Sequence, residues 1–193
     1  MRKVIFSINT TLDGSADHTA GIADDELHDF FTGLLDEVDV SLMGRETYQL
    51  MASYWPVAHK DPECTEIIKR FADKFNAMRK IIFSNTLKSV DWQNSVLAEK
   101  DLLSTVRELK KENGKSISAG SISIAGQLFK HNLIDEFWFV VHPVIAGKGP
   151  RLFEGIDNVK HLKLIDSKIL ASGAVALHYS RIPDVKDITT DKI

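Results

Sequence analysis

Short apolar runs of strand length alternate with segments of helical periodicity along most of this chain. The first run, at residues 3–8, precedes residues 24–38, whose apolar side chains recur at helical spacing. The same criteria predict further strands at 40–43, 80–84, 95–98, 116–119 and 136–142, and further helices at 45–53, 64–77, 101–112 and 124–130. Such alternation favours parallel strands with helices packed against the sheet. We therefore expect an α/β fold with a mostly parallel sheet.

The pattern changes after the glycine-rich stretch Gly147-Lys148-Gly149-Pro150. Two strand patterns, at 161–168 and 175–180, flank a turn at Ser172-Gly173, which predicts a C-terminal antiparallel hairpin. The chain has 193 residues, enough for one sizeable core. We expect a single domain over residues 1–181 and a polar tail over residues 182–193.

Charge and composition argue against several classes of function. The formal net charge is −3, with acidic and basic residues interspersed, so we expect neither nucleic acid nor an anionic membrane as partner. The apolar run near the N-terminus stops at Ile8, too soon for a signal peptide or a spanning helix, which favours a cytoplasmic protein. Cys64 is the single cysteine and the histidines lack ligand spacing, so we predict no metal site.

Small and polar residues follow three of the predicted strands. They are Gly44, Arg45 and Thr47 after the first, Ser84, Asn85 and Thr86 after the second, and Gly120, Ser121, Ile122 and Ser123 after the third. In an open α/β sheet, ligands bind outside the carboxyl ends of the strands, where helix N-termini offer N–H groups to anions. Each feature alone is explained by a turn or by an exposed arginine. The three features together favour a nucleotide site about as strongly as they favour ordinary turns. The spacing from Gly120 to Gly126 matches no dinucleotide fingerprint.

Acidic residues open the helix predicted at 24–38. Asp24, Asp25 and Glu26 stand where helix capping favours carboxylates, and capping explains them most simply. A carboxylate there could also protonate a substrate imine if burial raised its pKa. Glu26 is the preferred candidate for that role because it precedes Phe30 by one helical turn.

Four stretches of the chain together suggest a family. They are SINTTLDGS, VSLMGRETYQLM, KIIFSNTL and AGSISIAGQLFKHNLIDEFWFVVHPVIAGKGPRLF. In this order they resemble the signatures of the dihydrofolate reductase-like superfamily, nearest to the branch with the C-terminal reductase domain of bacterial riboflavin biosynthesis. The resemblance implies a mixed, mostly parallel sheet flanked by helices, with NADPH bound across the strand ends.

The resemblance also implies roles for particular residues. Gly44, Arg45 and Thr47, together with Ser84, Asn85 and Thr86, would lie at the adenosine half of NADPH, and Gly120, Ser121, Ile122 and Ser123 would approach its pyrophosphate. Ile8, Asn9 and Thr10 would border the nicotinamide and the substrate, with Asp13 and Glu26 as candidate catalytic carboxylates. Ile122 departs from a glycine common in relatives, and a β-branched residue disfavours positive φ, so we expect a reshaped turn.

The function that follows is an NADPH-dependent reductase that transfers hydride to a C=N or C=O carbon of a pteridine-like or ribosylaminopyrimidine-like substrate. The alternative is a non-catalytic nucleotide-binding or interaction module on the same scaffold. We also expect a homodimer, because relatives dimerise and the apolar run at residues 137–141 exceeds what one core would bury.

Overall fold

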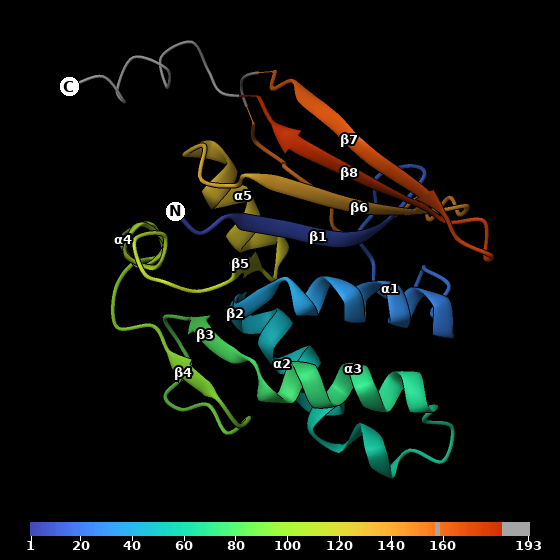
Figure 1. The fold of residues 1–193 in the computed structure, drawn as a ribbon, viewed down its shortest axis with the longest axis horizontal. Helices are drawn as coiled ribbons and strands as arrows, with labels where there is room; N and C mark the ends of the chain where they lie inside the picture. Colours follow the sequence, from blue (N-terminus) through green and yellow to red (C-terminus); the bar gives the residue numbers. More distant parts are fainter. Residues whose placement is uncertain (157–158, 183–193) are drawn as a thin grey trace.

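The computed structural model describes residues 1–156 and 159–182, and within them one eight-stranded sheet has the order β4-β3-β2-β5-β1-β6-β8-β7 (Figure 1). The strands are β1 (Val4–Thr11), β2 (Val38–Gly44), β3 (Arg79–Phe83), β4 (Ser95–Leu97), β5 (Ser116–Ala119), β6 (Glu136–His142), β7 (Leu162–Ile169) and β8 (Val175–Arg181). Strands β1 to β6 pair in parallel, whereas β8 runs antiparallel to both β6 and β7. The α/β class, the mostly parallel sheet and the C-terminal antiparallel hairpin are thus confirmed.

The helices connect these strands. They are α1 (Asp25–Asp36), α2 (Arg45–Tyr54), α3 (Glu66–Ala77), α4 (Leu102–Leu109) and α5 (Ile122–Lys130), with a 3-10 helix, η1 (Trp55–Lys60), between α2 and α3. Helices α1 and α3 pack side by side (Figure 1). Only Ile182 of the predicted tail, 182–193, lies within the described residues, so the division into domain and tail stays a prediction.

Several helix boundaries differ from the predicted ones by up to three residues, among them those of α4 and α5. Helix α4 stops at Leu109 and not at Glu112, because the N–H groups of Lys111 and Glu112 bond to carbonyls three residues back and tighten the chain into a turn. Helix α5 starts at Ile122, two residues early, directly after the extended Ser121.

The core fills both faces of the sheet, and alternate residues of β1 belong to different sides. Val4 and Phe6 pack with residues of α4 and α5, whereas Ile5 packs with residues of α2 and α3. Leu27 of α1 packs against Val140 of β6. The hydrophobic effect therefore holds β1 in the centre of the molecule.

Lys80 on β3 is fully buried and fixes the end of α3. Its Nζ donates to the carbonyl oxygens of Phe75, Asn76 and Met78 at 2.9, 3.2 and 2.6 Å, and lies 4.3 Å from the ring centre of Trp92. Burial lowers the pKa of Lys80 to about 8, so the ammonium still carries its proton at neutral pH. The three carbonyls use all three of its donors.

The apolar run at residues 137–141 is partly covered within the chain, with Phe137 and Val140 buried and the other three residues half-buried. It lies in β6, an interior strand between β1 and β8. Trp138 stacks on His178 with ring centres 4.0 Å apart, and Phe139 contacts Phe6 edge-on. This run therefore gives no support to a homodimer, which stays a prediction. The outer strand β7 is more exposed, with Leu164, Ile165 and Ile169 at least half accessible.

Candidate functional site

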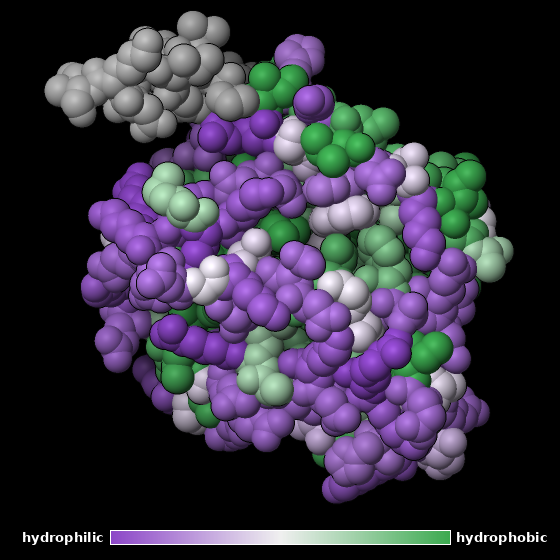
Figure 2. Space-filling view, viewed as in Figure 1, coloured by the Kyte–Doolittle hydropathy of each residue, from purple (hydrophilic) through white to green (hydrophobic). Residues whose placement is uncertain are grey.

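The middle of the sheet is open beside the carboxyl half of β1. Pairing with β5 covers only Val4–Phe6, whereas pairing with β6 continues to Thr11. Ser7, Ile8 and Asn9 are only half-buried although β1 is a central strand. Figure 2 shows apolar atoms reaching the surface among hydrophilic ones near the middle of one face. We call the space beside residues 7–9, on the β5 side, the β1 crevice; it is the kind of place where α/β sheets bind ligands.

Two helix N-termini start side by side at the neighbouring ends of β2 and β5. Gly44 precedes α2, and Ser121 precedes α5. The backbone N–H of Gly44 donates to Ser121 Oγ at 3.1 Å, and a Cβ on Gly44 would lie 2.9 Å from Ser123 Oγ. Glycine at position 44 therefore lets the two helix starts come close together.

These two helices differ from the other α-helices at their N-caps. Asp24, Thr65 and Asp101 precede α1, α3 and α4, and each accepts a hydrogen bond from a backbone N–H in the first turn. In the described part of the chain, α2 and α5 have no side-chain cap, because Gly44 has no side chain and Ser121 Oγ accepts from Gly44. Their first-turn N–H groups remain available to an anion.

Arg45 and Ser84 follow strand ends that lie in register. Gly44 pairs with Phe83 at the ends of β2 and β3, so the two following residues share one edge of the sheet. The Arg45 side chain is about half exposed and reaches the Glu46 carboxylate at 3.2 Å. Ser84 Oγ accepts from the backbone N–H groups of Thr86 and Leu87 and closes the turn. Arg45 therefore lies where it can meet a ligand phosphate.

The backbone at Ile122 avoids the positive φ that a β-branched residue disfavours. Of the described residues other than glycine, only Asn94, Asn132 and Phe153 have positive φ, and Ile122 is simply the first residue of α5. A helical φ suits the β-branched side chain of isoleucine, and the reshaped turn stays a prediction. Gly120 carries the close approach instead.

The two candidate catalytic carboxylates are both held by neighbouring loops. Asp13 accepts from Thr11 Oγ1 at 2.6 Å and from the backbone N–H groups of Ala146 and Gly147. These hydrogen bonds lower the pKa of Asp13 to about 2, which makes it a poor proton donor. Glu26 Oε2 accepts from the Ala171 N–H at 2.6 Å in the turn between β7 and β8. Both carboxylates thus stabilise loops, and their catalytic roles stay predictions.

The structure adds His142, which was not among the site residues predicted from the sequence. It ends β6 opposite Thr11 and is 1% exposed. Its Nε2 lies 3.0 Å from Asn9 Oδ1, and the Ile22 N–H donates to its Nδ1 at 3.2 Å. Burial lowers the pKa of His142. Its position at a strand end before Pro143 was the available sequence signal.

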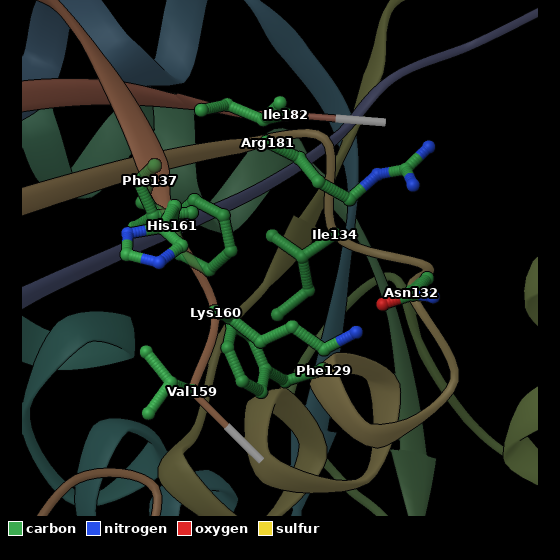
Figure 3. A pocket seen from close by; sticks show the side chains of 10 residues that line it. Phe129, Asn132, Ile134, Phe137, Val159, Lys160, His161, Arg181 and Ile182 are labelled. Carbon is green, nitrogen blue, oxygen red and sulfur yellow. The ribbon is translucent and has the colours of Figure 1, made fainter. Parts of the chain in front are cut away.

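Two cavities lie away from the β1 crevice. One of about 190 Å³, at the amino end of β6, is lined by side chains that include Phe129, Ile134 and Phe137 (Figure 3). The other, of about 650 Å³, lies against Tyr48 and Trp92. Within residues 1–156 and 159–182, no three His, Cys, Asp or Glu residues are grouped to hold a metal ion. None of the helices in these ranges is both long and apolar enough to span a bilayer.

The chain and its fold match known proteins over almost the whole length. Uncharacterized protein YyaP of Bacillus subtilis (strain 168) is 30% identical over 182 residues, covering 92% of this chain and 94% of YyaP. A putative riboflavin biosynthesis protein from Shewanella sp. PV-4 superposes with a TM-score of 0.71 at 19% identity, covering 94% of this chain and 99% of that one. Dihydrofolate reductase from Enterococcus faecalis, in a complex with NADP(H), gives 0.60 at 11% identity, covering 94% and 97%.

These similarities place the observed sheet within the dihydrofolate reductase-like fold. A sequence profile of the RibD C-terminal domain covers residues 2–176, which include both uncapped helices and the β1 crevice. The chain therefore belongs to the RibD C-terminal domain family.

Proposed function

We propose that the protein is an NADPH-dependent reductase that transfers hydride to a C=N or C=O carbon of a pteridine-like or ribosylaminopyrimidine-like substrate. The observation that carries this proposal is the pair of uncapped helix N-termini at the ends of β2 and β5. Membership of the RibD C-terminal domain family supports it, as does the fold shared with a dihydrofolate reductase that binds NADP(H).

The residues at the strand ends fit a dinucleotide. The first-turn N–H groups of α2 and α5 would hold phosphate oxygens, and Gly44 and Gly120 keep the two helix starts close enough to act together. Arg45 would bind a phosphate of the adenosine half as a bidentate donor, with Thr47 and the loop at residues 84–86 beside it. NADPH bound there would supply the hydride.

The substrate would lie in the β1 crevice. Ile8 offers an apolar side chain on one face of the strand, and Asn9 offers a polar side chain on the other face. Thr10 is buried and donates to the Ser15 carbonyl at 3.1 Å, so it fixes the following loop more than it contacts a ligand. The protein would thus orient the acceptor carbon and exclude water from it.

The alternative is a nucleotide-binding module without turnover, and one observation favours it. Asp13 and Glu26 are both engaged by backbone N–H groups, so neither stands free to deliver a proton. Absorbance assays of NADPH oxidation with dihydropteridines and with aminouracil ribosides separate the two functions. Oxidation that depends on the added substrate supports the reductase, and saturable NADPH binding without oxidation supports the module.

A further inference from the structure

We propose that His142 fixes Asn9 as a hydrogen-bond donor in the β1 crevice, so that the site selects ligands presenting an acceptor there, a carbonyl oxygen or an unprotonated ring nitrogen. The proposal rests on the proposed function in one respect, that the crevice holds the substrate ring. It assigns Asn9 as a specificity residue and His142 as the residue that positions it.

The first step is the tautomer of His142. A backbone N–H can only donate, so Nδ1, which receives the Ile22 N–H at 3.2 Å, carries no proton. A neutral imidazole has one proton, which therefore resides on Nε2. Nε2 lies 3.0 Å from Asn9 Oδ1, so it donates to that oxygen. A single backbone hydrogen bond thus determines which end of the Asn9 amide faces the imidazole.

The surroundings of His142 keep it neutral and in place. The side chain is buried, and this burial lowers its pKa, while the carboxylate of Asp24 at the start of α1 acts in the opposite direction. A second proton would put an Nδ1–H against the Ile22 N–H. A Cβ on Gly21 would lie 3.1 Å from Nε2, so the backbone at residue 21 lies directly over the ring and restricts its rotation.

The consequence for Asn9 follows from its own chemistry. Because Oδ1 faces the imidazole of His142, the amide nitrogen is the end turned away from His142, and it carries two donors. Within the described ranges the structure gives this nitrogen no acceptor, and the Asn9 side chain is half-buried beside the open half of β1. A ligand carbonyl satisfies the donors, whereas a ligand amino group would face N–H with N–H. Pairing of this kind discriminates between ligands by about tenfold or more.

The first experiment tests the tautomer in the free protein, with neither cofactor nor substrate. Long-range ¹H–¹⁵N correlation spectra of the ¹⁵N-labelled full chain report both ring nitrogens of each histidine, and the His142→Gln spectrum assigns the signals of His142. We expect a neutral ring with the proton on Nε2 at pH 7, persisting below the ordinary histidine pKa of about 6.5. A charged ring at pH 7, or a proton on Nδ1, would overturn the proposal.

The second experiment measures the preference itself by calorimetry with two flat probes, 6-aminouracil, which presents carbonyl oxygens, and 1,3-diaminobenzene, which presents amino groups and has no ring nitrogen, at a pH where neither is charged. We expect the wild type to favour 6-aminouracil about tenfold, and Asn9→Asp, which replaces the donor by an acceptor of the same shape, to reverse the preference. Asn9→Leu should abolish it, which separates hydrogen bonding from the added charge. Equal ratios in all three proteins would refute the assignment of Asn9.

Variants of His142 test positioning. His142→Gln keeps a side-chain donor and should retain the preference, whereas His142→Phe frees Asn9 to rotate and should bring the two affinities close to parity. A ratio unchanged in His142→Phe would overturn the role of His142. NADPH titrations of the same samples test the proposed function separately. If NADPH does not bind but the affinity ratios of the two probes are as expected, only the proposal of NADPH as cofactor is contradicted.

Discussion

Gly120 lies where β5 comes close to β2, and its replacement by alanine tests whether that approach matters. The added methyl carbon would lie 2.7 Å from Ser41 Oγ and 3.1 Å from the Leu42 carbonyl oxygen. The serine hydroxyl can rotate away, but the Leu42 carbonyl accepts the Gly120 N–H at 2.8 Å and cannot. The strand ends must then separate by a few tenths of an ångström. Overpacking of this kind costs about 1–3 kcal/mol.

The separation also affects the proposed phosphate site, since β2 and β5 lead directly into the two uncapped helices. We expect Gly120→Ala to lower the free energy of unfolding by about 1–3 kcal/mol. If one charge-assisted hydrogen bond to a phosphate is lost, NADPH binding weakens by about 1.5 kcal/mol, roughly tenfold. Urea unfolding followed by circular dichroism and calorimetric NADPH titration measure the two effects.

Gly126, in the interior of α5, provides the matched control, because a Cβ there would meet nothing within 4 Å. Gly126→Ala should raise the unfolding free energy by about 0.5–1 kcal/mol, as expected for alanine in a helix interior, and leave NADPH binding unchanged. The reasoning is refuted if the Gly120 variant is as stable as the Gly126 variant and binds NADPH equally well.

Three further predictions concern single side chains. Lys80→Met leaves three carbonyl groups at the end of α3 without their donor, and should lower the unfolding free energy by about 1–3 kcal/mol in urea; unchanged stability would contradict this role. Tyr48→Phe removes the acceptor of the Asp91 and Trp92 N–H groups and should lower the unfolding free energy by about 1–3 kcal/mol. A urea midpoint equal to that of the wild type would argue against this role. Asp13 has its pKa lowered from 3.8 to about 2, so its stabilising effect is complete above pH 3.8 and is lost as the pH falls through about 2. The melting temperatures of wild type and Asp13→Asn should therefore differ at pH 6 and converge near pH 2, and a constant difference would exclude this origin.

Periodicity and turn chemistry predicted most of the elements. The strand expected at 136–142 coincides with β6, because its apolar run is long. The helix after Gly44 starts where expected, because the glycine marks a sharp boundary. The six residues of η1 are too few to show a period. The order of the strands, with β5 between β2 and β1, depends on contacts between distant segments that no local pattern encodes.

The site was harder to predict for the same reason. Ser121 stands at the N-cap position of α5, yet its hydroxyl accepts from the N–H of Gly44, 77 residues away. The bonds of His142 to Ile22 and Asn9 span 120 and 133 residues. Glu26 and Asp13 likewise bond to the backbone of segments far along the chain. Residue type indicated which groups could act, and only the fold shows what each group contacts.

The proposed function depends on NADPH binding at the ends of β2 and β5. Calorimetric titration of the full chain with NADPH and with NADH tests it most directly, using Arg45→Ala beside Arg107→Ala, an exposed arginine in the last turn of α4. We expect saturable NADPH binding that weakens about tenfold in Arg45→Ala and stays at the wild-type level in Arg107→Ala. Absence of binding to the wild type, or equal affinity in all three proteins, would contradict it.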